Sequence, residues 1–188
     1  MAFISLFEVI GPNMVGPSSS HTAGAVSMAL LARKLFPAEI KKVEFTLYGS
    51  FAKTYRGHGT DRALVAGILG MMPDDAKLKD SLSIAESEGI TIKFLPADLG
   101  QVHPNTVKME MILEDGSKST VMGASIGGGN IKLTEMDGLA LDFNGSRSAV
   151  VLEIKDIPGA IAFITGILGH NNKNISMIST NKPAKSEY

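Results

Sequence analysis

The chain has 188 residues, of which 44% are apolar and 20% charged, and its formal net charge is −1. This composition is ordinary for a globular protein, the length allows one large domain or two small ones, and the balanced charge gives no basic field for nucleic acid. The chain has no cysteine, which excludes disulfides, thiolate zinc sites and any iron–sulfur cluster held by this chain alone.

Localisation and metal signals are also missing from the sequence. No apolar run approaches the roughly 18 residues of a membrane span, and the first seven residues carry no basic segment ahead of an apolar core. We therefore expect a cytoplasmic protein without membrane contact or a secretory signal. The histidines stand at positions 21, 58, 103 and 170, and none of them pair at the i, i+4 spacing of a helical metal site. We expect no metal ligands in this chain.

The most informative stretch is Gly16 to Thr22, which reads Gly-Pro-Ser-Ser-Ser-His-Thr ahead of a predicted helix. Hydroxyl side chains are strong helix caps, and the positive end of the helix dipole favours an anion. The stretch suits a carboxylate or phosphate with an acid/base group nearby, although a plain cap would use the same residues. The candidate substrate-binding and catalytic residues here are Ser18, Ser19, Ser20, His21 and Thr22.

The first half of the chain alternates apolar segments with polar loops. A short apolar segment, Ser5 to Val9, predicts a helix or an entry strand. A buried helix should follow, ended by Pro37, then a half-buried strand and a second apolar helix capped by Thr60 or Asp61. The predicted helices are Thr22–Phe36 and Asp61–Met71, the strand is Lys42–Gly49, and Pro73–Lys79 is a linker.

A second polar loop, residues 50–61, repeats the arrangement of the first site. It places His58 beside glycines just ahead of the second buried helix, with Lys53 and Arg56 as nearby cations. Two such helix starts could converge on one ligand, in which case His58 is a candidate acid/base group. The alternative is a loop histidine that only hydrogen-bonds a backbone carbonyl.

The next segments predict an α+β domain with antiparallel strands and separate helices. A helix is expected at Asp80–Glu88 and a strand at Thr91–Leu95, followed by hairpins turning at Asp115-Gly116 and Asp137-Gly138. Two motifs lie between these elements. The first is His103-Pro104-Asn105-Thr106, which is a candidate ligand-binding turn or a plain turn. The second is Ser125-Ile-Gly-Gly-Gly129, whose glycines allow close backbone approach.

The end of the chain predicts a separate β-α-β unit. After a boundary at residues 144–147, a strand is expected at Ser148–Ile154, a helix from Asp156-Ile-Pro-Gly159 to about Gly169, and a strand at Ile175–Thr180. Residues 181–188 form a polar tail. A unit of roughly 40 residues is too small to close a core, so it must pack on the first domain, on a partner chain, or be half of something larger.

Four motifs in this order resemble the β chain of the bacterial iron–sulfur-dependent L-serine dehydratases. They are the stretch 16–24, the stretch 49–61, His103–Thr106 and Ser125–Gly129. The resemblance implies a serine dehydratase β domain over residues 1–146, similar to the allosteric substrate-binding domain of some phosphoglycerate dehydrogenases. It also implies a partial ACT-like domain over residues 147–180.

The resemblance implies deamination of L-serine to pyruvate and ammonia. It places a 4Fe–4S cluster on cysteines of a separate α chain, where one iron acts as Lewis acid on the serine hydroxyl while a base removes the Cα proton. We expect a lyase component of amino-acid catabolism with His58 and His21 as catalytic residues, of which His58 is the better candidate for the acid/base group, and we expect homo-oligomer contacts. The residues expected to bind or support the substrate are Ser18, Ser19, Ser20, Thr22, Lys53, Arg56, His103, Asn105 and Thr106.

Two alternatives stay open. The same loops could form a non-catalytic module that senses an amino acid or anion, or the chain could be a structural partner of the cluster chain. The final segment departs from an ACT domain, which needs βαββαβ, because only three elements are present. Asp156 and Asn174 stand where ACT domains bind amino acids, but Ile154 occupies a position where a polar side chain is expected. This segment could instead be a docking or dimerisation element.

Overall fold

The computed structural model describes residues 11–36 and 38–180, and it divides into two compact units between Arg147 and Ser148. We describe each unit by itself. The predicted segment Ser5–Val9, the helix-ending Pro37 and the tail 181–188 lie outside the described residues.

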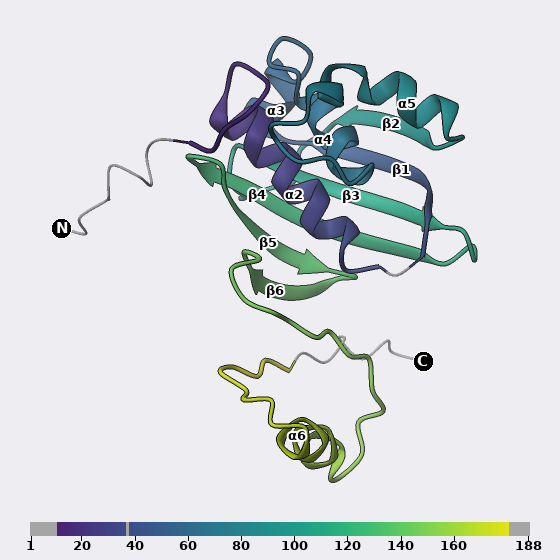
Figure 1. The fold of residues 1–188 in the computed structure, drawn as a ribbon, viewed down its shortest axis with the longest axis vertical. Coiled ribbons are helices and arrows are strands. Elements are labelled where there is room, and N and C mark those ends of the chain that lie inside the picture. Colours follow the sequence, from purple (N-terminus) through teal and green to yellow (C-terminus); the bar gives the residue numbers. More distant parts are fainter. Residues whose placement is uncertain (1–10, 37, 181–188) are drawn as a thin grey trace, which may run out of the picture. The chain divides into compact units, whose positions relative to one another are not determined.

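The first unit is built on one six-stranded sheet with the order β2-β1-β3-β4-β5-β6 (Figure 1). Strands β1 and β2 run parallel, and each of the other neighbouring pairs is antiparallel. The strands are β1 (Ile40–Leu47), β2 (Thr91–Pro96), β3 (Thr106–Leu113), β4 (Lys118–Gly127), β5 (Asn130–Met136) and β6 (Leu139–Phe143). The α+β class is therefore confirmed, as are both predicted hairpins.

Helices α2 and α4 lie side by side over the sheet (Figure 1). The first of them starts as a π-helical turn, η1, and continues without a break into α2. The helical elements of this unit are η1 (Ser19–Ala23), α2 (Gly24–Arg33), α3 (Gly49–Thr54), α4 (Thr60–Ile68), the 3₁₀ helix η2 (Ala76–Asp80) and α5 (Ser81–Ser87). The predicted helix at Thr22–Phe36 is confirmed, but it starts earlier, at Ser19, and ends earlier, at Arg33.

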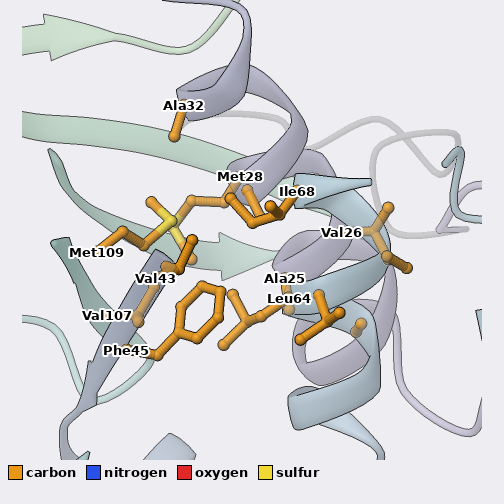
Figure 2. Close-up of a cluster of buried hydrophobic side chains, with 14 of the residues drawn as sticks. Ala25, Val26, Met28, Ala32, Val43, Phe45, Leu64, Ile68, Val107 and Met109 are labelled. Carbon is orange, nitrogen blue, oxygen red and sulfur yellow. The ribbon is translucent and has the colours of Figure 1, made fainter. Parts of the chain in front are cut away.

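The core lies between these helices and one face of the sheet (Figure 2). The alternation of β1 places Val43 and Phe45 on the covered face, where both are fully buried with Met28 of α2 and Leu64 of α4. Burying such side chains contributes about 1.5–3 kcal/mol each, before the conformational entropy that opposes folding. This packing fixes α2, and with it the Ser/His stretch at its start.

A glycine allows α2 and α4 to approach closely. A Cβ built at Gly67 of α4 would lie 2.5 Å from the carbonyl oxygen of Val26 and 2.8 Å from the backbone nitrogen of Leu30. The contacted atoms belong to backbone, which cannot move aside as a flexible side chain could. Gly67 therefore sets the distance between the two helices.

Three predictions in the first unit were incomplete. The polar loop after β1 contains the helix α3, and the linker after α4 contains η2. Helix α4 begins at Thr60, but its N-cap is Gly59 in the left-handed conformation, φ +68°, with no side-chain cap. A glycine can end one helical segment and start the next at this angle without Cβ strain, so the expected cap by Thr60 or Asp61 is wrong.

The second unit holds α6 (Ala160–His170), and within its described residues no strand flanks this helix. The predicted strands at 148–154 and 175–180 are therefore wrong, and the ACT-like description is not confirmed. A strand needs a neighbouring strand to hydrogen-bond its backbone N–H and C=O groups. A run of β-branched residues does not by itself provide that neighbour. Pro158 precedes the N-cap, Gly159, instead of lying in the first turn. Helix α6 buries none of its residues, and the side chain of Phe163 is 70% exposed.

Candidate functional site

Four segments that are distant in sequence meet at one end of the sheet. Strand β1 ends at Leu47, opposite Val107 near the start of β3, and Val107 faces Gly123 near the end of β4. Helix α3 follows the end of β1, and η1 packs against β4. This end of the sheet therefore collects all four sequence motifs.

Ser18 begins the first helix, as expected of a cap. Its backbone is extended, with φ −142° and ψ 124°, and its Oγ accepts a hydrogen bond of 3.1 Å from the backbone N–H of His21. The helix continues with Thr22 N–H donating to the carbonyl oxygen of Ser18 at 2.9 Å. The N–H groups of Ser19 and Ser20 precede that first helical bond and belong to the electropositive end of the helix.

The start of this helix is wider than an α-helix. The N–H of Gly24 donates to the carbonyl oxygen of Ser19, which is the i→i+5 bond of a π turn. Such turns occur often at functional sites. The widening occurs where a Cβ on Gly24 would collide with Oγ of Ser125, so β4 and the helix are in close contact there.

Hydroxyl groups surround the imidazole of His21. Its Nδ1 lies 3.1 Å from Oγ of Ser20 and 3.5 Å from Oγ of Ser18, and its Nε2 lies 3.0 Å from Oγ of Ser50. Phe51, which is fully buried, meets the ring edge-on at 5.2 Å between centroids. Partial burial, and secondarily the neighbouring His58, lower the pKa of His21 from its ordinary value near 6.5. This surrounding therefore favours the neutral form of the ring over the protonated one.

His58 lies against His21, with ring centroids 4.9 Å apart and planes tilted by 35°. Its backbone carbonyl accepts a hydrogen bond of 3.2 Å from Oγ1 of Thr22. Its Nδ1 is buried and has no hydrogen-bond partner among the described residues. The two predicted catalytic histidines are thus brought together, and Thr22 ties their loops to each other.

The motif His103–Thr106 forms a turn closed by its own side chains. The N–H of Asn105 donates to Nδ1 of His103 at 3.1 Å, and Oγ1 of Thr106 donates to the carbonyl oxygen of His103 at 2.7 Å. The turn reaches the site through Pro104, whose carbonyl oxygen accepts from the N–H of Ser50 at 2.8 Å. These side chains therefore stabilise the turn. The carbonyl oxygen of Pro104 within it holds the backbone of Ser50.

The two predicted cations lie on α3 and in the turn that follows it. Lys53 is exposed on α3, and the guanidinium of Arg56 stands over the ring of Tyr55, 5.3 Å from its centroid. The charge of Arg56 is thus engaged in a cation–π contact.

The sequence reasoning assigned no role to Ser50 and Ser125. Ser50 contacts His21 directly, and Ser125 is fully buried with an Oγ that has no partner among the described residues. Ser50 directly follows Gly49, and Ser125 lies two residues before Gly127, and glycines near strand ends allow close backbone approach. Gly49 adopts φ +58° against Pro104, and Gly127, Gly128 and Gly129 all have positive φ. A polar residue beside such a glycine was the signal available in the sequence.

The described residues offer no place for a metal ion, since no three His, Asp or Glu side chains among them are close enough to share one. Two concavities of ≈ 390 and ≈ 330 Å³ lie at the opposite end of the sheet, near the starts of β1 and β2. We call Ser18, Ser20, His21, Ser50 and His58 the Ser/His cluster. None of these residues lines either concavity. In the part of the chain that the structure describes, no helix is both long and apolar enough to cross a bilayer.

Comparison with known proteins supplies the family. The sequence model of the family described as serine dehydratase beta chain matches residues 3–89. The L-serine dehydratase beta chain of Peptoniphilus asaccharolyticus is 44% identical over 183 residues, which cover 97% of this chain and 82% of that protein. The probable L-serine dehydratase beta chain of Bacillus subtilis (strain 168) is 42% identical over 93% of this chain and 79% of its own. L-serine dehydratase 2 of Escherichia coli (strain K12) is 38% identical over 77 residues, 16% of its length. The chain belongs to the L-serine dehydratase beta chain family.

Proposed function

We propose that this chain is the beta component of an L-serine dehydratase that converts L-serine to pyruvate and ammonia at a site shared with an alpha chain. Membership of the beta chain family supports the substrate and the existence of a second chain. The observation that carries the proposal is the paired imidazoles of His21 and His58 beside the serine hydroxyls at the start of η1.

The start of the first helix suits the carboxylate of an amino acid. The N–H groups of Ser19 and Ser20 and the hydroxyls of Ser18 and Ser20 are donors gathered at the positive end of a helix that continues through α2. A carboxylate bound there lies next to the two imidazoles, since Ser20 is within 3.1 Å of His21.

The chemistry assigned to this chain is a proton transfer. Elimination removes the Cα proton of serine and its β-hydroxyl, giving 2-aminoacrylate and water, and the aminoacrylate hydrolyses to pyruvate and ammonia. We assign the base to His58, because both ring nitrogens of His21 already face hydroxyls, whereas the buried Nδ1 of His58 has no hydrogen-bond partner among the described residues. A positioned imidazole contributes typically about 10²–10⁴-fold to such a transfer.

The residues of this chain do not fit an iron–sulfur cluster. There is no cysteine in the sequence, and the described residues hold no cluster of His, Asp or Glu ligands. A 4Fe–4S group that serves this reaction belongs on the alpha chain, and the steps assigned above run through side chains of this chain alone.

A shared site agrees with the partial exposure of the residues at this end of the sheet. The serine and histidine side chains of the cluster are only partly buried, and the exposed residues Pro12, Pro17 and Ile126 lie in the segments beside them. A charged substrate needs a water-poor enclosure for efficient elimination, which a second protein surface would complete.

The proposal is tested by mixing this chain anaerobically with its alpha partner and measuring pyruvate from L-serine. We expect turnover only when both chains are present. Full turnover by the alpha chain alone would assign this chain to regulation or scaffolding, and serine binding to the isolated chain would then identify a sensing module.

A further inference from the structure

We propose that Thr22 is a positioning residue whose hydroxyl sets the place of His58 against His21, and that Thr22 makes no contact with the substrate. The inference rests on the proposed function for its kinetic consequence, whereas the placement of His58 is a property of this chain alone. It goes beyond that function because the sequence motif groups Thr22 with the hydroxyls expected to bind substrate.

The side chain of Thr22 is closed off from solvent. The residue is 1% exposed, whereas its neighbours Ser20 and His21 are only half-buried. Gly16 packs directly on it, since a Cβ built at Gly16 would lie 2.5 Å from Cγ2 and 2.8 Å from Oγ1 of Thr22. The missing side chain of Gly16 therefore lets the backbone cover Thr22. A substrate at the Ser/His cluster would have to displace this cover to reach Oγ1 of Thr22.

The hydroxyl of Thr22 takes part in a hydrogen bond whose direction is fixed. Its Oγ1 donates to the carbonyl oxygen of His58 at 3.2 Å, and a carbonyl oxygen can only accept. A threonine within a helix commonly donates to a carbonyl oxygen in the preceding turn of its own helix. Thr22 instead donates to a residue 36 positions further along the chain. Its hydroxyl therefore joins the first helix to the loop that precedes α4.

His58 depends on its backbone for its position. Nδ1 of its ring is buried and has no hydrogen-bond partner among the described residues. Its N–H donates to the carbonyl oxygen of Thr54 at 3.0 Å, which attaches the loop to α3 but not to the helix that carries His21. The bond from Thr22 makes that second attachment. Because Thr22 directly follows His21, this bond holds the two histidines together where their rings meet at 4.9 Å.

The consequence is a separation of roles within the serine stretch. The hydroxyls of Ser18 and Ser20 lie beside the imidazole of His21, whereas the hydroxyl of Thr22 is directed to the main chain of His58. Loss of the Thr22 hydroxyl should therefore displace His58 and slow the proton transfer without weakening the binding of L-serine. A misplacement of about 1 Å at a reacting group can cost about 10²-fold in rate, so even a partial release of the loop should lower kcat.

The placement of His58 is measured by proton NMR of the full-length chain, as a nuclear Overhauser effect between the ring protons of His21 and His58. The ring signals are assigned with H21Q and H58Q. We expect the effect in the wild type and in T22S, which keeps the hydroxyl. We expect a weakened effect in T22V, which keeps the shape of threonine but lacks the hydroxyl.

T134V is the matched control for this measurement, since Oγ1 of Thr134 in β5 donates to the carbonyl oxygen of Met122 at 3.3 Å. This substitution removes the same kind of hydrogen bond and should leave the effect unchanged. An unchanged effect in T22V, or an equal loss in T22S, would overturn the proposal. The T22S result separates the hydroxyl from the methyl group even where T22V does not fold.

Kinetics of the anaerobic complex with the alpha chain supply the functional arm. T22V should lower kcat about 10-fold, with KM for L-serine changed by less than about 2-fold, while T22S and T134V keep wild-type values. A raised KM at unchanged kcat in T22V would make Thr22 a substrate ligand and overturn the proposal. An equal loss of kcat in T22V and T134V would also contradict positioning. If the wild-type complex did not turn over L-serine, the proposed function would fail, while the NMR result would still decide the placement of His58.

Discussion

His21 and His58 are 37 positions apart in the sequence, yet their rings lie 4.9 Å from each other and are tilted by 35°. Thr22, the neighbour of one histidine, donates a hydrogen bond to the carbonyl oxygen of the other at 3.2 Å. The contact joins the starts of the two helices that cover the sheet. It is the structural basis for treating the serine stretch and the second polar loop as one site.

The cap formed by Ser18 gives a prediction on stability and on binding together. S18A removes the acceptor of the His21 N–H, which should lower the free energy of unfolding by about 1 kcal/mol and raise KM for L-serine in the complex. Urea unfolding and steady-state kinetics check the two parts. The matched control is D75A, which removes the cap that accepts from the N–H of Lys77 at the start of η2. D75A should destabilise similarly without changing KM, and equal KM values for both variants would contradict a binding role.

The lowered pKa of His21 predicts a dependence of stability on pH. The folded state disfavours the protonated ring because of burial and the nearby His58, whereas the unfolded chain takes up the proton near pH 6.5. The unfolded state therefore binds more protons just below that pH, so this contribution to stability is complete above pH 6.5 and is lost as the pH falls through the lower folded pKa.

Urea unfolding at about pH 7.5 and about pH 5.5 measures this contribution, because these values bracket the ordinary pKa of imidazole. The wild type should lose more stability on acidification than H21Q, in which the titrating ring is absent. The remaining ionisable groups are the same in both proteins and serve as the internal reference. Parallel losses in the two proteins would show that His21 is not the group responsible.

Gly67 gives a prediction on the packing of α2 against α4. G67A should destabilise the first unit by about 1–3 kcal/mol, because the methyl group would meet the backbone of Val26 and Leu30. Hydrogen exchange of amides in β1 reports this loss. G166A is the control, since Gly166 is also helical but has nothing within 4 Å of an added Cβ. There alanine should stabilise α6 by up to about 1 kcal/mol. A neutral G67A would mean that the helices can separate without loss.

Local patterns predicted the strands of the first unit well. The alternation along β1 follows from a sheet with one covered face, and the turns at Asp115-Gly116 and Asp137-Gly138 follow from residues that accept positive φ. The buried character of α2 was evident because apolar residues surround most of its circumference. These features depend on near neighbours in the chain.

Features that depend on tertiary contacts were not predictable in this way. The parallel pairing of β1 with β2 joins segments separated by α3, α4, η2 and α5, and the contact of Ser50 with His21 spans 29 positions. The strands expected around α6 failed for the same reason, since a β-rich segment such as Val150-Val151 forms a strand only when another strand pairs with it. Arg56 was expected to support the site because of its charge, and its contact with the ring of Tyr55 was not foreseen.

The central claim is that the Ser/His cluster of this chain carries out proton transfer in the dehydratase, and the H58A variant tests it most directly. Pyruvate formation from L-serine is measured with the anaerobic complex of this chain and its alpha partner. H170A is the control, because His170 is an exposed histidine of α6 whose ring bonds only the carbonyl oxygen of Gly166 among the described residues. We predict that H58A lowers kcat by about 10²-fold or more with the complex intact, while H170A retains wild-type turnover. Full turnover by an intact H58A complex would contradict the account.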